Sequence, residues 1–172
     1  MHRILCLIAV IPLLCLSARA QENARGKGVS LNPYGIVAGT IELRYESRTG
    51  PGTSAHAGLR YYALNKNWTA PGLGGGLRWY LYPDDGARAL SGFAIGPHAY
   101  FVYWLYDEDR EYDIRRLALL VGADASYKWV WENFFFEPSI SLEFYPLTAA
   151  DSPKGRTVLE PVFGIHVGFA WD

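Results

Sequence analysis

Serine, histidine and carboxylate side chains recur on one face of several segments of this chain, and together they could perform acyl transfer. A serine hydroxyl becomes a nucleophile when a histidine removes its proton and a carboxylate orients that histidine. The residues of these types on the polar face are Ser126, Ser139, Ser141, His98, His166, Glu137 and Glu143. No Gly-x-Ser-x-Gly or His-x-Ser spacing accompanies them, so we expect no catalytic residues and no enzyme. A lipid-modifying enzyme is kept as the second alternative.

Three histidines could instead converge on a metal ion, because imidazole nitrogens are common metal ligands. His56, His98 and His166 lie on three separate segments, and no His-x-His or His-x-x-x-His spacing supports a metal site. Hydrogen-bonded groups in a polar interior explain these residues better. We therefore expect no metal site and no cofactor.

A larger set of charged residues shares the polar face. Its members are Glu42, Arg44, Glu46, Arg60, Arg78, Asp124, Lys128, Glu137, Glu143 and Glu160. Inside a small barrel, which side chains just fill, such charges must pair or cost several kcal/mol each. The set therefore predicts a salt-bridged plug, and a narrow conductance along the same network is the alternative.

These groups belong to segments in which apolar and polar residues alternate. In the last segment Phe163, Val167 and Trp171 fall on one side, and Gly164 and His166 on the other. A period of two residues is typical of β-strands. The predicted strands are 35–46, 54–63, 73–82, 90–104, 114–129, 134–145 and 159–171. The predicted connections are 47–53, 65–72, 83–86, 107–112, 131–133 and 148–156.

Seven strands are visible, whereas a closed single-chain bacterial barrel normally has an even number. The expected eighth is the weak segment 28–32, which turns at Asn32-Pro33 into the following strand. The alternative is an N-terminal segment that lies across or inside the barrel. The fold class predicted is thus all-β, a closed antiparallel up-and-down transmembrane β-barrel of eight strands.

The first 20 residues are typical of a cleaved signal peptide. Arg3 is followed by the apolar stretch Ile4–Leu16 and by the small-x-small site Ala18-Arg19-Ala20. Both cysteines and the only methionine lie within it, so no disulfide is expected in the mature chain. Of the 16 basic residues, two lie there, so 14 basic and 17 acidic residues remain and the net charge is −3. The expected division is a signal peptide 1–20, an N-terminal segment 21–34 and a barrel 35–172.

The polar face decides whether apolar side chains point outward, as in a membrane barrel, or inward, as in a soluble lipocalin-like binder. Glycines gather on that face, at Gly58, Gly74, Gly76, Gly92, Gly96, Gly122, Gly164 and Gly168. A water-facing strand gains nothing from glycine, whereas a crowded barrel interior needs small residues. The apolar face carries aromatic residues near strand ends that suit an interfacial girdle, namely Tyr45, Trp79, Tyr103, Trp129, Phe144 and Trp171. We therefore expect the apolar face to contact lipid.

Location and orientation follow from the export signal and from the lengths of the connections. No uninterrupted apolar run of about 18 residues follows the signal peptide, so a membrane helix is not predicted. The expected location is the bacterial outer membrane. Periplasmic turns are short in such barrels, which assigns the connection 131–133 to the periplasm and 65–72, 107–112 and 148–156 to the exterior.

Several strand patterns together resemble a known family. They are Asn32-Pro33 with Gly39–Glu46, then Gly76–Leu81, then Gly92–His98. The chain resembles the short bacterial outer-membrane β-barrels of a family of unknown function, and the resemblance implies an architecture like that of OmpA or OmpW without implying an activity. Such barrels usually end on an aromatic residue that the assembly machinery recognises, whereas here Trp171 is followed by Asp172.

The function expected from the sequence is a non-enzymatic outer-membrane barrel with a structural or surface-interaction role and a charged, filled lumen. A narrow channel or a passage for small hydrophobic solutes, which would need an open lumen or a lateral gap between strands, is the first alternative. The expected partners are outer-membrane lipid and the assembly machinery. Nucleic acid is not expected, because the mature chain is not basic. The oligomeric state is left open.

Overall fold

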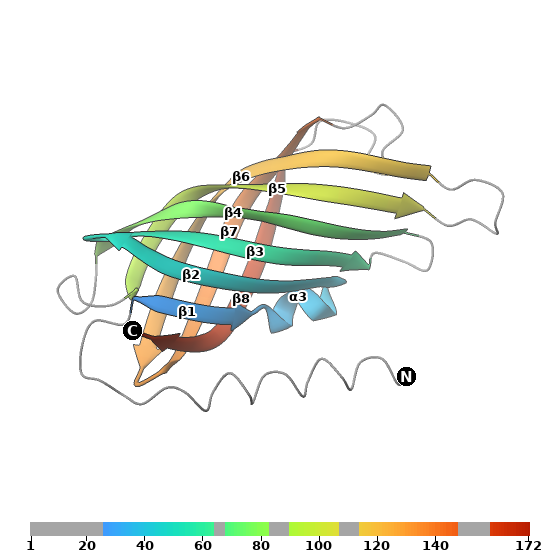
Figure 1. Ribbon diagram of the computed structural model, residues 1–172. Coiled ribbons are helices and arrows are strands. Elements are labelled where there is room, and N and C mark those ends of the chain that lie inside the picture. Colours follow the sequence, from blue (N-terminus) through green and yellow to red (C-terminus); the bar gives the residue numbers. More distant parts are fainter. Residues whose placement is uncertain (1–25, 64–67, 83–89, 107–113, 148–158) are drawn as a thin grey trace.

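Eight antiparallel strands form a closed barrel in which each strand pairs with its neighbours in sequence and β8 returns to β1 (Figure 1). The structure is a computed structural model, and it describes residues 26–63, 68–82, 90–106, 114–147 and 159–172. The strands are β1 Lys27–Leu31, β2 Thr40–Gly50, β3 Thr53–Ala63, β4 Trp68–Tyr82, β5 Gly92–Tyr106, β6 Ile114–Trp131, β7 Phe134–Leu147 and β8 Glu160–Trp171. A short helix, α3, spans Pro33–Val37. The predicted all-β, up-and-down, eight-stranded architecture is confirmed.

The weak N-terminal segment is the strand that closes the barrel. β1 pairs on one side with β2, where Lys27 faces Ser47, and on the other with β8, where Lys27 faces Trp171. At five residues it is the shortest strand, so β2 and β8 both extend beyond it. The first strand of the barrel therefore lies within the segment 21–34, ahead of the boundary expected at residue 35.

The strand predicted at 35–46 starts too early, because a helix occupies its first part. Asn32 caps α3 by accepting a hydrogen bond from the Gly35 amide at 2.9 Å, and Pro33 stands in the first turn, where its missing N–H is not needed. Gly39, with φ 81°, then turns the chain into β2, which begins at Thr40. In this stretch the helix cap of Asn32 and the proline in the first turn favour a helix, although apolar and polar residues alternate as in a strand.

Three connections are shorter than predicted. The expected turn at 47–53 contracts to Pro51 and Gly52, since β2 continues to Gly50 and β3 starts at Thr53. The expected loop at 65–72 gives way to β4 from Trp68, where Pro71 pairs with Tyr61. Pro71 and Gly72 are residue types that favour turns. They are nevertheless part of a strand here, because β3 supplies their pairing partners. The connection at 131–133 reduces to Glu132 and Asn133. The predicted connections 83–86, 107–112 and 148–156 lie outside the described residues.

The two faces of the wall differ sharply in chemistry. Leu73, Phe101 and Leu117 point outward and are 60%, 59% and 63% exposed, whereas Arg78 points inward and is fully buried. This is the reverse of a lipocalin-like barrel. Inward glycines leave room for large polar side chains, as at Gly58, where an added Cβ would lie 2.6 Å from the Tyr100 hydroxyl. Among the described residues, no helix is long and apolar enough to cross a membrane.

The six aromatic residues proposed as a girdle all lie on the outer face but gather unevenly. Trp79 pairs across the ladders with Thr53 and Ile95, near the tight β2–β3 turn, and Trp129 stacks on Phe136 near the β6–β7 turn. Tyr45 and Trp171 are in contact at the same end, with ring centroids 6.3 Å apart. Tyr103 and Phe144 lie in the opposite half, on β5 and β7.

Candidate functional site

The barrel interior holds a polar layer that is built from two groups of charged side chains. The first group, called the Arg78 cluster, comprises Arg78, Lys128, Glu46, Asp124 and Glu137. Arg78 contacts three carboxylates, with distances of 2.6 Å to Glu137, 2.9 Å to Asp124 and 3.4 Å to Glu46. Lys128 pairs with Glu46 and lies 3.1 Å from Glu137. All five side chains are buried, so each charge relies on its neighbours.

Hydroxyl groups complete the Arg78 cluster. Glu46 accepts hydrogen bonds from Ser54 at 2.5 Å and from Tyr80 at 2.8 Å. Phe135 lies beside Lys128, whose Nζ is 4.7 Å from the ring centroid. Tyr80 also belongs to a buried apolar group with Leu90 and Ala94 on the same side of the lumen. The Arg78 cluster is therefore closed off by side chains toward the end of the barrel that carries the tight turns.

The second group, called the Arg60 cluster, comprises Arg60, Arg44, Glu42, Glu143 and His98. Arg60 lies 2.7 Å from Glu143 and 3.3 Å from Glu42, and Arg44 donates to Glu42 at 3.0 Å. His98 Nε2 lies 3.3 Å from Glu143. The Arg60 guanidinium also stacks over Tyr100, 4.0 Å from its ring centroid, and the Tyr100 hydroxyl donates to Glu42 at 3.3 Å.

Two longer contacts connect the clusters. Arg44 Nη1 lies 3.5 Å from Glu137, and His98 Nδ1 lies 3.6 Å from Asp124. Beyond the Arg60 cluster, the lumen side of β3 to β6 is filled by buried apolar and aromatic residues. They are Tyr62, Ala70, Tyr100, Val102, Trp104, Ala118 and Leu120. On the β3 to β6 side of the lumen, the polar layer thus lies between two groups of buried apolar side chains.

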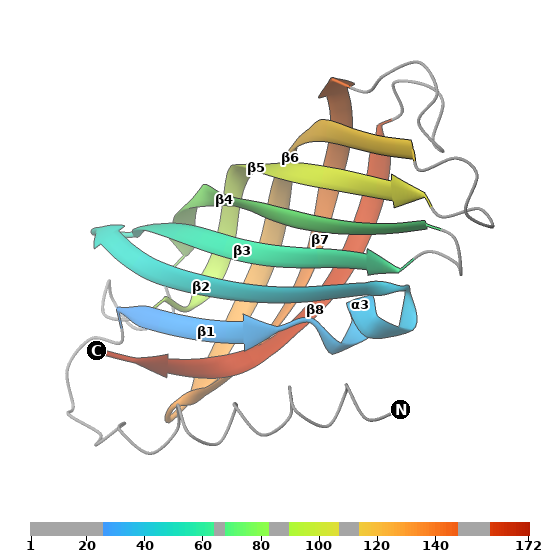
Figure 2. The same cartoon turned by 45° about the vertical axis from the view of Figure 1, so that its right-hand side comes forward.

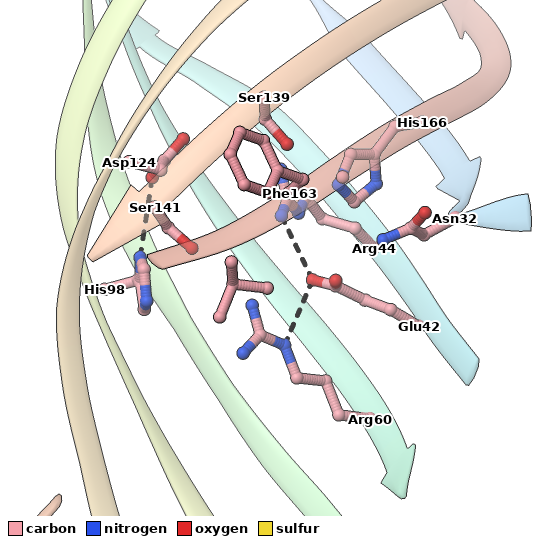
Figure 3. Close-up of a pocket in the computed structure, with 12 residues that line it drawn as sticks. Asn32, Glu42, Arg44, Arg60, His98, Asp124, Ser139, Ser141, Phe163 and His166 are labelled. Atoms are coloured by element: carbon pink, nitrogen blue, oxygen red, sulfur yellow. Dashed lines mark hydrogen bonds and ion pairs between the residues drawn. The ribbon is translucent and has the colours of Figure 1, made fainter. Parts of the chain in front are cut away.

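A small cavity borders the Arg60 cluster and reaches the Arg78 cluster only at Asp124 (Figure 3). The cavity has a volume of about 20 Å³. Its lining residues are Asn32, Glu42, Arg44, Arg60, His98, Asp124, Ser139, Ser141, Val162, Phe163, Gly164 and His166. Arg44 Nε and Nη1, Arg60 Nε and His166 Nδ1 make no hydrogen bond among the described residues. Several polar groups beside the cavity therefore have hydrogen-bonding capacity that the described residues do not use.

The serine, histidine and acid residues considered above do not form a triad among the described residues. Ser141 donates to Glu143 at 3.4 Å instead of to a histidine. The Ser126 hydroxyl is buried without a hydrogen-bond partner among the described residues. Ser139 and His166 both line the cavity, and a Cβ added at Gly164 would lie close to both side chains. No hydrogen bond between Ser139 and His166 is found in the described part of the chain.

The three histidines are buried on separate strands and do not share one centre. His98 contacts Asp124 and Glu143, whereas His56 Nδ1 and His166 Nδ1 have no hydrogen-bond partner within the described ranges. Within the same ranges, no group of three potential metal ligands is close enough to hold an ion.

Nine of the ten charged residues singled out in the sequence are buried in the lumen and belong to the two clusters. Glu160 differs, since it stands at the start of β8, half-buried, opposite Glu143 in the β7–β8 ladder. Sequence reasoning missed the partners Ser54, Tyr80 and Tyr100, and it missed Asn32 as a lining residue. Ser54, Tyr80 and Tyr100 lie on the inward parity of their strands, so the alternation itself was a signal that could have found them.

The fold and the lumen define the protein as a closed eight-stranded antiparallel barrel with an apolar outer face and a charged, filled interior. Among solved structures, the crystal structure of the N-terminal β-barrel domain of Pseudomonas aeruginosa OprF is similar, with a TM-score of 0.60 and 12% sequence identity. The match covers 87% of this chain and 100% of the OprF domain. At this identity the likeness concerns the fold alone. No family model and no curated protein matches the sequence.

Proposed function

We propose that this protein is an integral barrel of the bacterial outer membrane, exported by a cleaved signal peptide, with a structural or surface-interaction role. Support for the membrane location comes from the outer face, where leucine, phenylalanine and tryptophan side chains are widely exposed. A water-soluble barrel would rarely expose so continuous an apolar surface. The similar OprF domain has the same barrel architecture.

The non-conducting, non-enzymatic character rests on one observation, the three-layered filling of the lumen. Arg78 is fully buried among three carboxylates, and buried apolar side chains on the β3 to β6 side of the lumen lie on both sides of the polar layer. An ion passing through would have to displace these pairs, which costs several kcal/mol per uncompensated charge. Interactions with the surroundings would then fall to the connections after β3, β5 and β7.

The test is planar-bilayer conductance of the refolded protein beside an Arg78→Ala variant. Both proteins are first floated with lipid vesicles to establish insertion. We expect silence in both, because the Tyr100–Leu120 side of the apolar filling remains when Arg78 is removed. Discrete conductance that changes in Arg78→Ala would overturn the structural role and support the alternative of a narrow channel. Failure to float with vesicles would overturn the membrane location itself.

A further inference from the structure

The barrel wall is incomplete where β1 ends. β1 stops at Leu31, which faces Leu43 of β2 and Val167 of β8. Beyond these residues, 40–42 of β2 and 160–166 of β8 have no β1 partner in the described ladders. Asn32 and α3 lie there instead, and α3 contacts both strands (Figure 2). This part of the wall is called the β2–β8 wedge.

Asn32 holds the wedge together through its side chain. Its Oδ1 accepts hydrogen bonds from the Gly35 amide at 2.9 Å and from the Ile165 amide at 3.3 Å. Its own amide donates to the Glu42 carbonyl at 3.1 Å. One residue therefore connects α3, β2 and β8 by a few polar contacts, whereas elsewhere the wall is joined by continuous strand ladders.

The cavity lies directly behind this wedge. Its lining includes Asn32 and Glu42, together with residues 162–164 and 166 of β8, all beyond the end of β1 (Figure 3). On its inner side, three guanidinium nitrogens make no hydrogen bond among the described residues, namely Arg44 Nε, Arg44 Nη1 and Arg60 Nε. Arg44 Nη1 lies 3.5 Å from Glu137 and Arg60 Nε lies 3.3 Å from Glu42, so their ion pairs are long, and both arginines are more than nine-tenths buried. Guanidinium groups in this state favour an oxyanion, which can accept two parallel hydrogen bonds.

Charge balance favours an anion here and not deeper in the lumen. The Arg60 cluster has two guanidinium groups against two carboxylates, Glu42 and Glu143. The Arg78 cluster has two cations, Arg78 and Lys128, against three carboxylates. An incoming anion is therefore repelled more strongly by the Arg78 cluster, of which only Asp124 lines the cavity.

The outside of the wedge is apolar. Val37 is 88% exposed, and Tyr34 and Ile36 on the same helix are also exposed. Phe163, which lines the cavity, is 58% exposed on β8, and Ile41 is exposed on β2. The wedge thus places an apolar surface next to guanidinium groups that are not fully hydrogen-bonded, a combination that matches a molecule with an anionic head and an apolar tail.

We propose that the β2–β8 wedge binds a single-chain fatty acid, with the carboxylate at Arg44 and Arg60 and the hydrocarbon chain along Phe163 and α3. This inference rests on the proposed membrane location. The cavity has room for about one water-sized group. The carboxylate therefore enters when the contacts of Asn32 to Gly35 and Ile165 separate, which makes Asn32 the residue that limits access.

The experiment measures binding of carboxyl-¹³C-labelled palmitate to the full barrel, refolded in nanodiscs of zwitterionic lipid, from the shift and broadening of the carboxyl NMR signal. Methyl palmitate, observed at its own labelled carboxyl carbon, and acetate are the comparison probes. We expect saturable palmitate binding, with at least about tenfold weaker binding of either comparison probe. Equal binding of methyl palmitate would reveal simple partitioning, and equal binding of acetate would reveal a site for small anions only. Either result would overturn the proposal.

Variants locate the site. Arg44→Gln, which retains a polar side chain of similar length, is expected to weaken palmitate binding about tenfold. Phe163→Ala should weaken it several-fold, whereas Phe101→Ala, equally exposed on β5, should leave it unchanged. Asn32→Ala should accelerate palmitate exchange. Unchanged binding in Arg44→Gln, or equal losses in the two phenylalanine variants, would overturn the assignment.

Membrane insertion of every variant is measured separately by vesicle flotation. Absent palmitate binding by a protein that floats with vesicles overturns the wedge site and leaves the proposed function standing. A protein that does not insert overturns the proposed function itself. The two failures are therefore distinguishable.

Discussion

The Arg78 cluster and the Arg60 cluster use the same kinds of residue, yet they differ in how completely they are enclosed. Arg78 is fully buried, and Ser54 and Tyr80 complete the coordination of Glu46. The Arg60 cluster borders a cavity, and among the described residues three of its guanidinium nitrogens make no hydrogen bond, against one, Arg78 Nε, in the Arg78 cluster. The difference follows from the wall, because β1 spans the level of Glu46 but ends before Glu42. Arginine–carboxylate pairs therefore form a plug where the wall is complete, at the Arg78 cluster. The same kind of pair borders a candidate binding site where the wall is incomplete, at the Arg60 cluster.

The largest expected effect comes from Arg78→Ala. This change leaves Glu46, Asp124 and Glu137 without their shared cation, so we expect a loss of about 3–5 kcal/mol in the free energy of unfolding. Urea unfolding in lipid vesicles measures it. The control is Arg48→Ala, because Arg48 is partly exposed and its Nε donates to a backbone carbonyl, that of Gly50, at 3.0 Å. If the two variants lost similar amounts of unfolding free energy, the Arg78 cluster would contribute no more to stability than a partly exposed charge.

Arg60→Ala sharpens the comparison, with an expected loss of about 2–3 kcal/mol in the same assay. Arg60 contacts two carboxylates, and the adjoining cavity allows water to solvate them after truncation. The loss should therefore be smaller than that of Arg78→Ala. A loss as large as that of Arg78→Ala would mean that the cavity gives no relief and that the clusters are equivalent.

Gly58→Ala tests how tightly the Arg60 cluster packs on the side away from the wedge. The new Cβ would lie 2.6 Å from the Tyr100 hydroxyl, which donates to Glu42. Displacing this ring should lower the free energy of unfolding by about 1–2 kcal/mol. In a Tyr100→Phe background the same glycine substitution should have a smaller effect, because the crowded oxygen is gone. Equal effects in both backgrounds would place the crowding elsewhere.

The smallest expected effect on stability belongs to Asn32→Ala, at about 1 kcal/mol, the usual cost of losing a helix cap. Its local effect should be larger. Hydrogen exchange at Gly35 and Ile165, whose amides donate to Asn32, should accelerate, while exchange around Arg78 on β4 stays unchanged. Acceleration spread evenly over the barrel would contradict a wedge that opens independently.

Much of the architecture was predictable because a strand has a period of two residues. Alternation alone assigned Phe163 to the outer face and His166 to the lumen, and the clustering of glycine on the polar face indicated which side was crowded. Prediction was wrong where local chemistry competes with alternation, as in α3, or where a partner strand extends a segment that begins with turn residues, as at Pro71.

By itself the sequence determined the class of fold, the faces of the strands and the residues that enter the lumen, since each of these depends on neighbours one or two positions away. Only the tertiary structure decided which charges pair. Arg60 and Glu143 are 83 positions apart, and Lys128 and Glu46 are 82 apart. Strand register and barrel closure bring such residues together, and one short strand, β1, decides where that closure is complete. The plug, the cavity and the wedge all follow from that register.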